Sequence, residues 1–76
     1  MRRRIKTLRP PELIRVLEKT GFTQKRQTGS HVIMAKEGMR AIPVPVHPKA
    51  LKRPLQIAIF KQAGLTPEEV EKLLAE

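Results

Sequence analysis

The stretch 22-FTQKRQTGSHVIMAKEGMRAIPVPV-46 decides the fold that we expect for this chain. Its segments are β-branched, apolar or alternating in polarity, and glycine-containing turns separate them, which is typical of short strands. We expect strands at residues 22–27, 31–35 and 40–46, and turns at residues 28–30 and 36–38. Connections this short predict an antiparallel meander of three strands.

Two details of this sheet follow from single residues. Pro43 and Pro45 have no N–H to donate to a neighbouring strand, so the third strand should be an edge strand whose prolines face away from the pairing side. In the second strand, His31 and Ile33 point to the same face because side chains alternate along a strand. We expect Ile33 to pack inward, which would place His31 where the sheet meets the helices.

Helices are predicted on both sides of this segment. Residues 10–20 carry apolar side chains at three- and four-residue spacing, and Gly21 can end that helix in the left-handed conformation. Residues 54–63 predict a second helix, and a short third one follows Thr66, which with Glu69 has the pattern of a capping box. The order helix, three strands and two helices predicts the α+β class, as a two-layer sandwich with its helices on one face of the sheet.

The length of 76 residues fits one small domain, residues 1–76, which begins with a basic arm over residues 1–9. The sequence has no cysteine, which is typical of proteins in a reducing compartment. No apolar run approaches the roughly 20 residues that cross a bilayer. The arm also lacks the apolar segment of a signal peptide. We therefore expect a cytoplasmic protein that does not act at a membrane.

The charge of the chain indicates a polyanionic partner. Sixteen Lys and Arg stand against seven Glu, and the formal net charge is +9. Residues 1–65 hold fifteen of the basic residues and three of the Glu, a net charge of +12. A body this basic favours nucleic acid, although a solvated basic surface that only aids solubility has the same composition. With two Phe as its only aromatic residues, the chain should recognise phosphates and the shape of double-stranded or structured RNA.

The residues available for catalysis are few. There are two histidines and neither Cys nor Asp, so a Ser-His-Asp triad is excluded and no set of three metal ligands has suitable spacing. A glycine-rich phosphate loop that opens a helix is also missing. We therefore expect neither a metal nor a cofactor. The remaining chemistry is acid–base catalysis by histidine on RNA, whose 2′-hydroxyl is a built-in nucleophile.

Candidate site residues gather around the first turn and after the third strand. His31 follows Gly29 and Ser30 directly and is the candidate general base. His31 and Ser30 could equally be ordinary turn residues, because a serine hydroxyl often bonds the turn backbone. His47 could serve structure alone or contact a phosphate. The candidate phosphate ligands are the basic residues Lys25, Arg26, Lys36, Lys49, Lys52 and Arg53.

Three motifs together resemble a known family. They are 21-GFTQKRQTGSH-31, 44-VPVHP-48 and 61-KQAGLTPEE-69, in an arrangement similar to the HicA family, the small toxins of HicA–HicB toxin–antitoxin systems. The resemblance implies a fold like that of double-stranded-RNA-binding domains and the activity of an mRNA interferase, a ribosome-independent endoribonuclease. It implies that His31 is catalytic, that Gly29 lets the RNA backbone approach, and that a HicB antitoxin is the partner.

One segment departs from the family pattern. Pro54-Leu55-Gln56 stands where relatives usually have Gly-Thr-Leu before the second helix. A phosphate contact made there by the threonine hydroxyl or the glycine backbone would be missing. The basic arm could offset this loss electrostatically.

Three functions remain open at this point. The first is the toxin of a type II toxin–antitoxin system, a metal-independent endoribonuclease that cleaves mRNA with His31 as general base. The second is a non-catalytic double-stranded-RNA-binding module. The third is a protein-interaction domain whose strand at residues 40–46 pairs with a partner.

Overall fold

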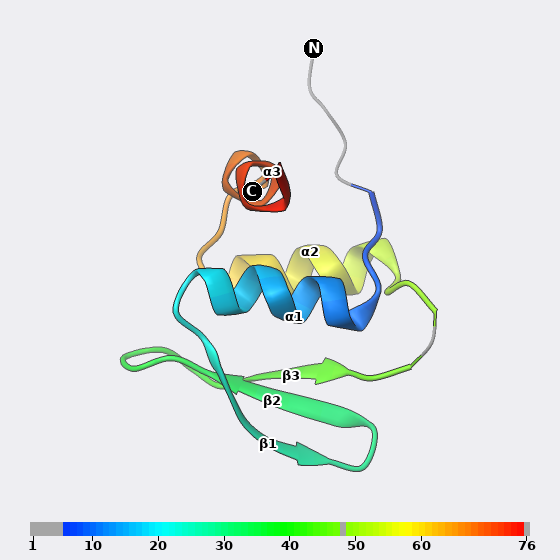
Figure 1. The fold of residues 1–76 in the computed structure, drawn as a ribbon, viewed down its shortest axis with the longest axis vertical. Coiled ribbons are helices and arrows are strands. Elements are labelled where there is room, and N and C mark those ends of the chain that lie inside the picture. The colour runs from blue at the N-terminus through cyan, green and yellow to red at the C-terminus, as the bar shows by residue number, and fades with distance from the viewer. Residues whose placement is uncertain (1–5, 48, 76) are drawn as a thin grey trace.

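The computed structural model describes residues 6–47 and 49–75. Helices α1 and α2 lie on one side of a three-stranded sheet, and α3 packs on the side of α1 away from the sheet (Figure 1). The elements are α1 (Pro10–Lys19), β1 (Thr23–Thr28), β2 (His31–Ala35), β3 (Ile42–Pro45), α2 (Arg53–Gln62) and α3 (Pro67–Ala75). The predicted α+β class, with the order helix, three strands and two helices, is confirmed.

The sheet is an antiparallel meander in the order β1-β2-β3, so β3 is an edge strand. Just beyond β3, the N–H of Val46 donates to the carbonyl of Ser30 at 2.7 Å. Because alternate residues of a strand direct their N–H groups to the same side, the ring nitrogens of Pro43 and Pro45 point to the outer edge. The edge strand with outward prolines therefore agrees with the sequence prediction.

The two faces of β2 are the reverse of what we expected. Val32 and Met34 are buried beneath the helices, whereas His31 is exposed and Ile33 only half-buried. The expectation that Ile33 packs inward is wrong. In a continuous apolar run, polar residues do not alternate with apolar ones to show which side chains face the core. The sequence therefore allows either Val32 with Met34 or His31 with Ile33 to face inward. The consequence is that His31 points to the open face of the sheet.

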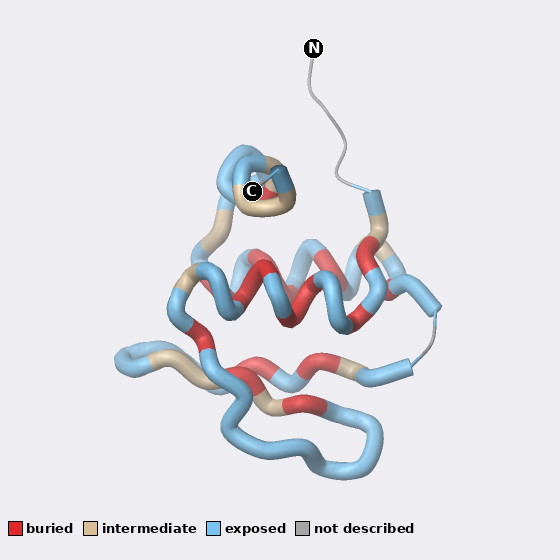
Figure 2. The backbone as a smooth tube through the Cα atoms, viewed as in Figure 1, coloured by how far each residue is buried: buried red, intermediate tan, exposed pale blue. Residues whose placement is uncertain are grey.

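Strand β1 extends away from the helices, and all six of its residues are exposed (Figure 2). Its sequence TQKRQT has no apolar side chain to bury on either face. The strand also contains a bulge. Gln24 lies opposite Met34 and Arg26 opposite Ile33, which leaves Lys25 as the extra residue.

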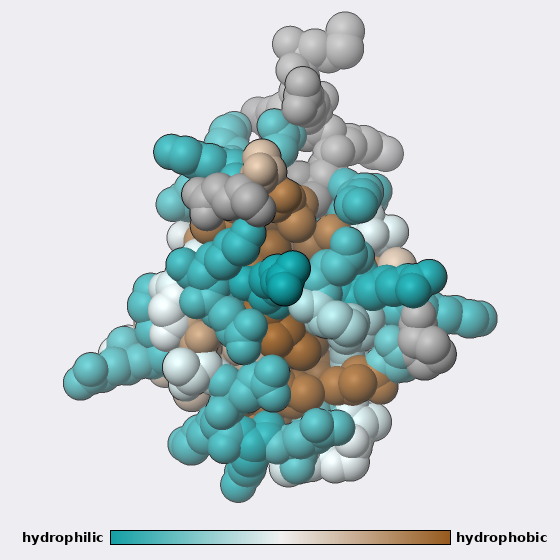
Figure 3. Space-filling view, viewed as in Figure 1, coloured by the Kyte–Doolittle hydropathy of each residue, from teal (hydrophilic) through white to brown (hydrophobic). Residues whose placement is uncertain are grey.

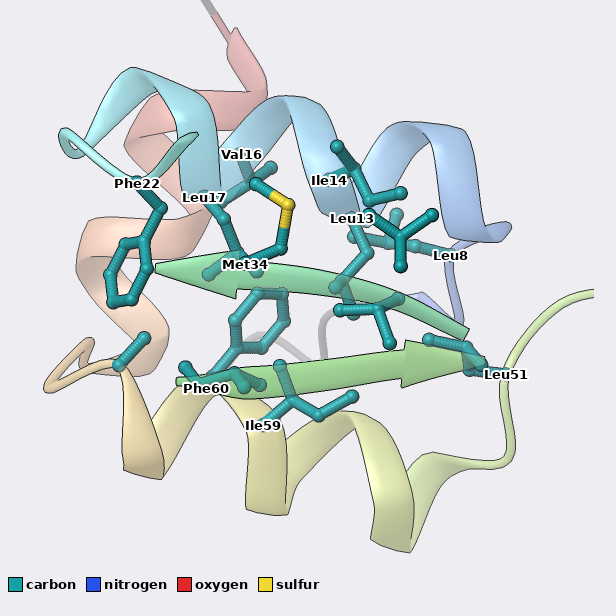
Figure 4. Close-up of a cluster of buried hydrophobic side chains, with 14 of the residues drawn as sticks. Leu8, Leu13, Ile14, Val16, Leu17, Phe22, Met34, Leu51, Ile59 and Phe60 are labelled. Carbon is teal, nitrogen blue, oxygen red and sulfur yellow. The ribbon is translucent and has the colours of Figure 1, made fainter. Parts of the chain in front are cut away.

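The core lies between the helices and the inner face of β2 and β3 (Figure 4). Gly21 ends α1 with a φ of 103°, and its N–H donates to the carbonyl of Glu18 at 3.0 Å. The N–H of Phe22 donates to the carbonyl of Leu17 at 3.1 Å. This pair of bonds is a Schellman motif, and it turns the buried Phe22 into the core before β1 begins.

Helix α3 begins with the predicted capping box. The N–H of Glu69 donates to Thr66 Oγ1 at 3.2 Å, and the N–H of Thr66 donates to Glu69 Oε1 at 2.9 Å. Val70 is fully buried against the core, and Lys19 Nζ donates to the carbonyl of Leu73 at 2.7 Å. These contacts attach α3 to α1 and not to the sheet.

The chain before α1 also packs against the domain. Residues 1–5 of the predicted basic arm lie outside the described residues. We call residues 6–9 the strap, because Leu8 is fully buried and its carbonyl accepts a hydrogen bond from the N–H of Leu51 at 2.8 Å. The basic arm is therefore anchored at its C-terminal end.

Candidate functional site

His31 is the first residue of β2, at the end of the β1–β2 hairpin. Its backbone is held on both sides, because it pairs with Thr28 of β1 and with Pro45 of β3. The imidazole is exposed on the sheet face that the helices leave uncovered. A histidine in this place has a fixed backbone and a side chain that an external molecule can reach.

The hydroxyl of Ser30 lies next to this imidazole. Ser30 Oγ is 3.3 Å from His31 Nδ1. When Nδ1 carries the proton and donates to Oγ, the other ring nitrogen, Nε2, keeps a free lone pair that can accept a proton. The pair can therefore hold the imidazole in the form that a general base needs.

Gly29 shapes the turn that precedes His31. Its φ is 50°, in the left-handed region that favours glycine. A Cβ at this position would meet no atom within 4 Å, so the space above the turn is open. The backbone of this turn is therefore exposed to solvent.

The hairpin brings one predicted phosphate ligand to the face of His31. Arg26 lies directly opposite Ile33, and directly opposed residues share a face, so Arg26, Ile33 and His31 are on the same side of the sheet. The bulge sets Lys25 beside Arg26, and both side chains are exposed. Two cations thus lie on the strand next to the candidate base. Thr28, which pairs with His31 on this face, was not among the candidates; only the register of the hairpin reveals it.

Lys36 lies elsewhere. It is five residues beyond His31, about 16 Å along β2. Its Nζ donates to the carbonyl of Thr20 at 2.7 Å and lies 5.7 Å from the centroid of the Phe22 ring. The structure therefore does not bring Lys36 together with His31.

The remaining candidates lie between β3 and α2. His47, Lys49 and Lys52 line a shallow pocket of about 410 Å³ together with Ala50 and Leu55. Arg53 is the half-buried first residue of α2. His31 does not line this pocket, so the two histidines do not share one cavity.

A larger hollow lies away from all the candidate residues. Its volume is about 690 Å³, and it is formed by α1, α3 and the helix-facing side chains of β1 and β2. Among its lining residues are Ile14, Arg15, Gln24, Gln27 and Leu73. None of the candidate residues lines it, so its size does not mark the candidate site.

Two further observations concern the described part of the chain only. No three His, Cys, Asp or Glu side chains come together there in a group that could hold a metal ion. None of its helices has the length and apolarity needed to cross a membrane. In the view of Figure 3, hydrophilic side chains cover most of the surface, with hydrophobic patches between them.

Comparison with known proteins now identifies the family. The model of the family described as "HicA toxin of bacterial toxin-antitoxin" matches residues 11–65, more than half of the chain. The chain belongs to the HicA toxin family. The matched residues contain the sheet, α1 and α2, whereas the strap and α3 lie outside them.

A solved structure supports this membership. The structure, described as "Toxin-Antitoxin complex from Streptococcus pneumoniae", contains a chain 34% identical to this HicA family member, with a TM-score of 0.66. The similarity covers 72% of this chain and 93% of that chain. No curated protein matches the sequence.

Proposed function

We propose that this HicA family member is the toxin of a type II toxin–antitoxin system and cleaves mRNA as a metal-independent endoribonuclease. One observation carries the proposal above the others. His31, in the Gly29-Ser30-His31 motif, is exposed at the end of a hairpin on the sheet face that no helix covers. RNA can reach it there without any change in the fold. Because its substrate is mRNA, the protein acts in the cytoplasm.

The proposed reaction needs only groups of this chain, the RNA and water. Nε2 of His31 accepts the proton of a 2′-hydroxyl while that oxygen attacks the adjacent phosphorus. The bond from phosphorus to the 5′-oxygen breaks, and the departing oxygen takes up a proton from water, whose hydroxide then removes the proton from Nε2 and restores the base. The products are a 2′,3′-cyclic phosphate and a free 5′-hydroxyl. Arg26 is placed to offset the negative charge that builds up on the phosphate in the transition state.

The proposed protein partner is a HicB-type antitoxin. Membership of a toxin family and the similarity to a chain of a toxin–antitoxin complex both support an antitoxin. An antitoxin bound to the exposed sheet face around His31 and Arg26 would keep RNA away from His31 and so stop cleavage. An acidic antitoxin segment would complement the cations of this face.

The deciding experiment compares wild type with His31→Ala on a structured mRNA in EDTA. We expect cleavage by wild type only, because general-base help of this kind is worth about 10²–10⁴ in rate. Both proteins should bind the RNA, since His31→Ala removes no cation. Equal cleavage by the two proteins would contradict the role of His31. Binding without cleavage by either would leave the non-catalytic RNA-binding module as the function.

The third hypothesis, strand pairing at residues 40–46, receives little support. A partner strand at the outer edge of β3 would meet the ring nitrogens of Pro43 and Pro45, which have no hydrogen to donate. This edge therefore offers acceptors without donors.

A further inference from the structure

The strap is fixed to α2 by a buried glutamine. Gln56 Oε1 accepts a hydrogen bond from the N–H of Leu8 at 2.7 Å, and Gln56 Nε2 donates to the carbonyl of Lys6 at 3.0 Å. The N–H of Leu51 adds a third bond, to the carbonyl of Leu8. The strap is thus joined to the first turn of α2 and to the loop before it.

Gln56 has no evident role apart from the strap. Its side chain is 2% exposed, and burial of an amide is unfavourable unless the amide forms hydrogen bonds. Both of its bonds go to the strap backbone. Without the strap, these polar atoms would lose both of their protein partners. We therefore treat Gln56 as the residue that positions the strap.

The strap brings together cations that are far apart in the sequence. Lys6 and Arg9 are exposed on the strap, and Lys49 and Lys52 are exposed on the loop that leads to α2. Arg9 and Lys52 are each one residue away from the hydrogen bond between Leu8 and Leu51, so their Cα atoms are separated by on the order of 10 Å. We call Lys6, Arg9, Lys49 and Lys52 the basic patch. Glu12, whose Oε2 is 4.0 Å from Lys6 Nζ, offsets part of its charge.

The basic patch lies within reach of an RNA strand bound at His31. Pro45 is the strand partner of His31, and Lys49 follows it four residues later, so the chain separates them by at most about 14 Å. Phosphates of one strand in B-form DNA succeed each other about every 3.4 Å along the axis, and the spacing in the A-form RNA helix is of the same order. A strand whose scissile bond is at His31 therefore reaches the patch within several nucleotides.

We propose that the basic patch is a second RNA-binding surface, held in place by Gln56, that contacts phosphates several nucleotides away from the bond cleaved at His31. The inference rests on the proposed function, because it takes RNA as the substrate. Lys6 and Arg9 of the strap lie outside residues 11–65, which match the family model, whereas Lys49 and Lys52 lie inside them. Lys and Arg without neighbouring aromatic side chains suit phosphate contacts rather than base stacking.

The test measures RNA binding in a His31→Ala background, in which the RNA stays intact. A short fluorescein-labelled RNA strand and its duplex are titrated by anisotropy at several salt concentrations. We expect Lys6→Gln with Arg9→Gln to lower the slope of log K against log salt by about 0.7 per lost contact for the single strand and about 0.9 for the duplex. Lys72→Gln, on α3, is the matched control and should leave the slope unchanged.

The role of Gln56 is tested by a double-mutant cycle. Gln56→Leu should lower the slope as the strap substitutions do, because the strap loses both of its bonds to the Gln56 side chain. In the Gln56→Leu background, Lys6→Gln with Arg9→Gln should then have little further effect. If Gln56 only stabilises the fold, Gln56→Leu should lower the melting temperature, and its effect on the slope should add to that of Lys6→Gln with Arg9→Gln.

The outcomes separate this inference from the proposed function. An unchanged slope in the Lys6→Gln, Arg9→Gln variant, with RNA still cleaved at His31 by the wild-type chain, overturns the inference alone. Lost affinity for the antitoxin with unchanged RNA binding assigns the patch to the antitoxin and also overturns it. If no variant binds RNA at all, both the inference and the proposed function are wrong.

Discussion

At the scale of single residues, the hydroxyl of Ser30 is positioned to orient His31, because Oγ lies 3.3 Å from Nδ1. We expect Ser30→Ala to lower kcat for RNA cleavage by about two- to tenfold, because a neutral hydrogen bond contributes about 0.5–1.5 kcal/mol. KM should stay the same, since Ser30 carries no charge that binds phosphate. Steady-state cleavage of a labelled RNA measures both constants.

Ser30→Thr is the matched control, because it keeps the hydroxyl and adds a methyl group at an exposed position. It should retain most of the activity. If Ser30→Ala cleaves as fast as wild type, the contact with Nδ1 of His31 has no part in catalysis.

The sequence named the candidate residues but could not give their arrangement in space. Arg26 and His31 share a face, as the short turn between their strands allows. Lys36 is as close to His31 in sequence as Arg26 is, yet it bonds the carbonyl of Thr20 at the other end of β2. Five residues along one extended strand separate Lys36 from His31 by the length of the strand. The same number of residues across a hairpin turn brings Arg26 back beside the strand that carries His31. The spacing of charges in the sequence therefore could not rank the phosphate ligands.

At the scale of elements, the sequence signals that succeeded were local. Gly21 ends α1, and Thr66 with Glu69 begins α3, because caps depend on bonds between residues a few positions apart. The strap was not predicted, since its position depends on Gln56, 48 residues away from Leu8.

The prolines of β3 should keep the edge of the sheet from pairing with another copy of the chain. We expect Pro43→Thr with Pro45→Thr to increase self-association, because the edge then gains N–H donors next to its free carbonyls. Analytical ultracentrifugation or light scattering over a range of concentrations measures the effect.

Pro54→Ala is the control for this prediction, because Pro54 is an exposed proline in the first turn of α2 and not in the sheet. It should leave the chain as associated as wild type. A monomeric Pro43→Thr, Pro45→Thr variant would show that the bulged, cationic β1 and the rest of the surface suffice to prevent strand pairing.

At the scale of the whole molecule, acidic and basic residues are separated. Helix α3 carries Glu68, Glu69 and Glu71 and lies beyond α1 on the side away from the sheet (Figure 1). The sheet side carries the cations of β1. With Lys72 included, Pro67–Ala75 still has a net charge of −2, so an approaching polyanion favours the cations of the sheet side over the α3 side, which orients it before contact.

Removal of residues 66–76 tests this separation. The remaining residues carry a net charge of +12 instead of +9, so we expect the truncated chain, in the His31→Ala background, to bind RNA more tightly at low salt. Its free energy of unfolding should fall by about 2 kcal/mol or more, because Val70 is fully buried and its packing is lost. Anisotropy and urea denaturation measure the two effects.

Val70→Ala separates charge from packing, because it weakens the contact of α3 without changing the net charge. We expect a lower free energy of unfolding, by about 2 kcal/mol, with unchanged RNA affinity. In the truncated chain, the RNA affinity should instead rise while the free energy of unfolding falls. If truncation weakens RNA binding as well as stability, α3 supports the RNA-binding face through the packing of α1, and its negative charge is of secondary importance.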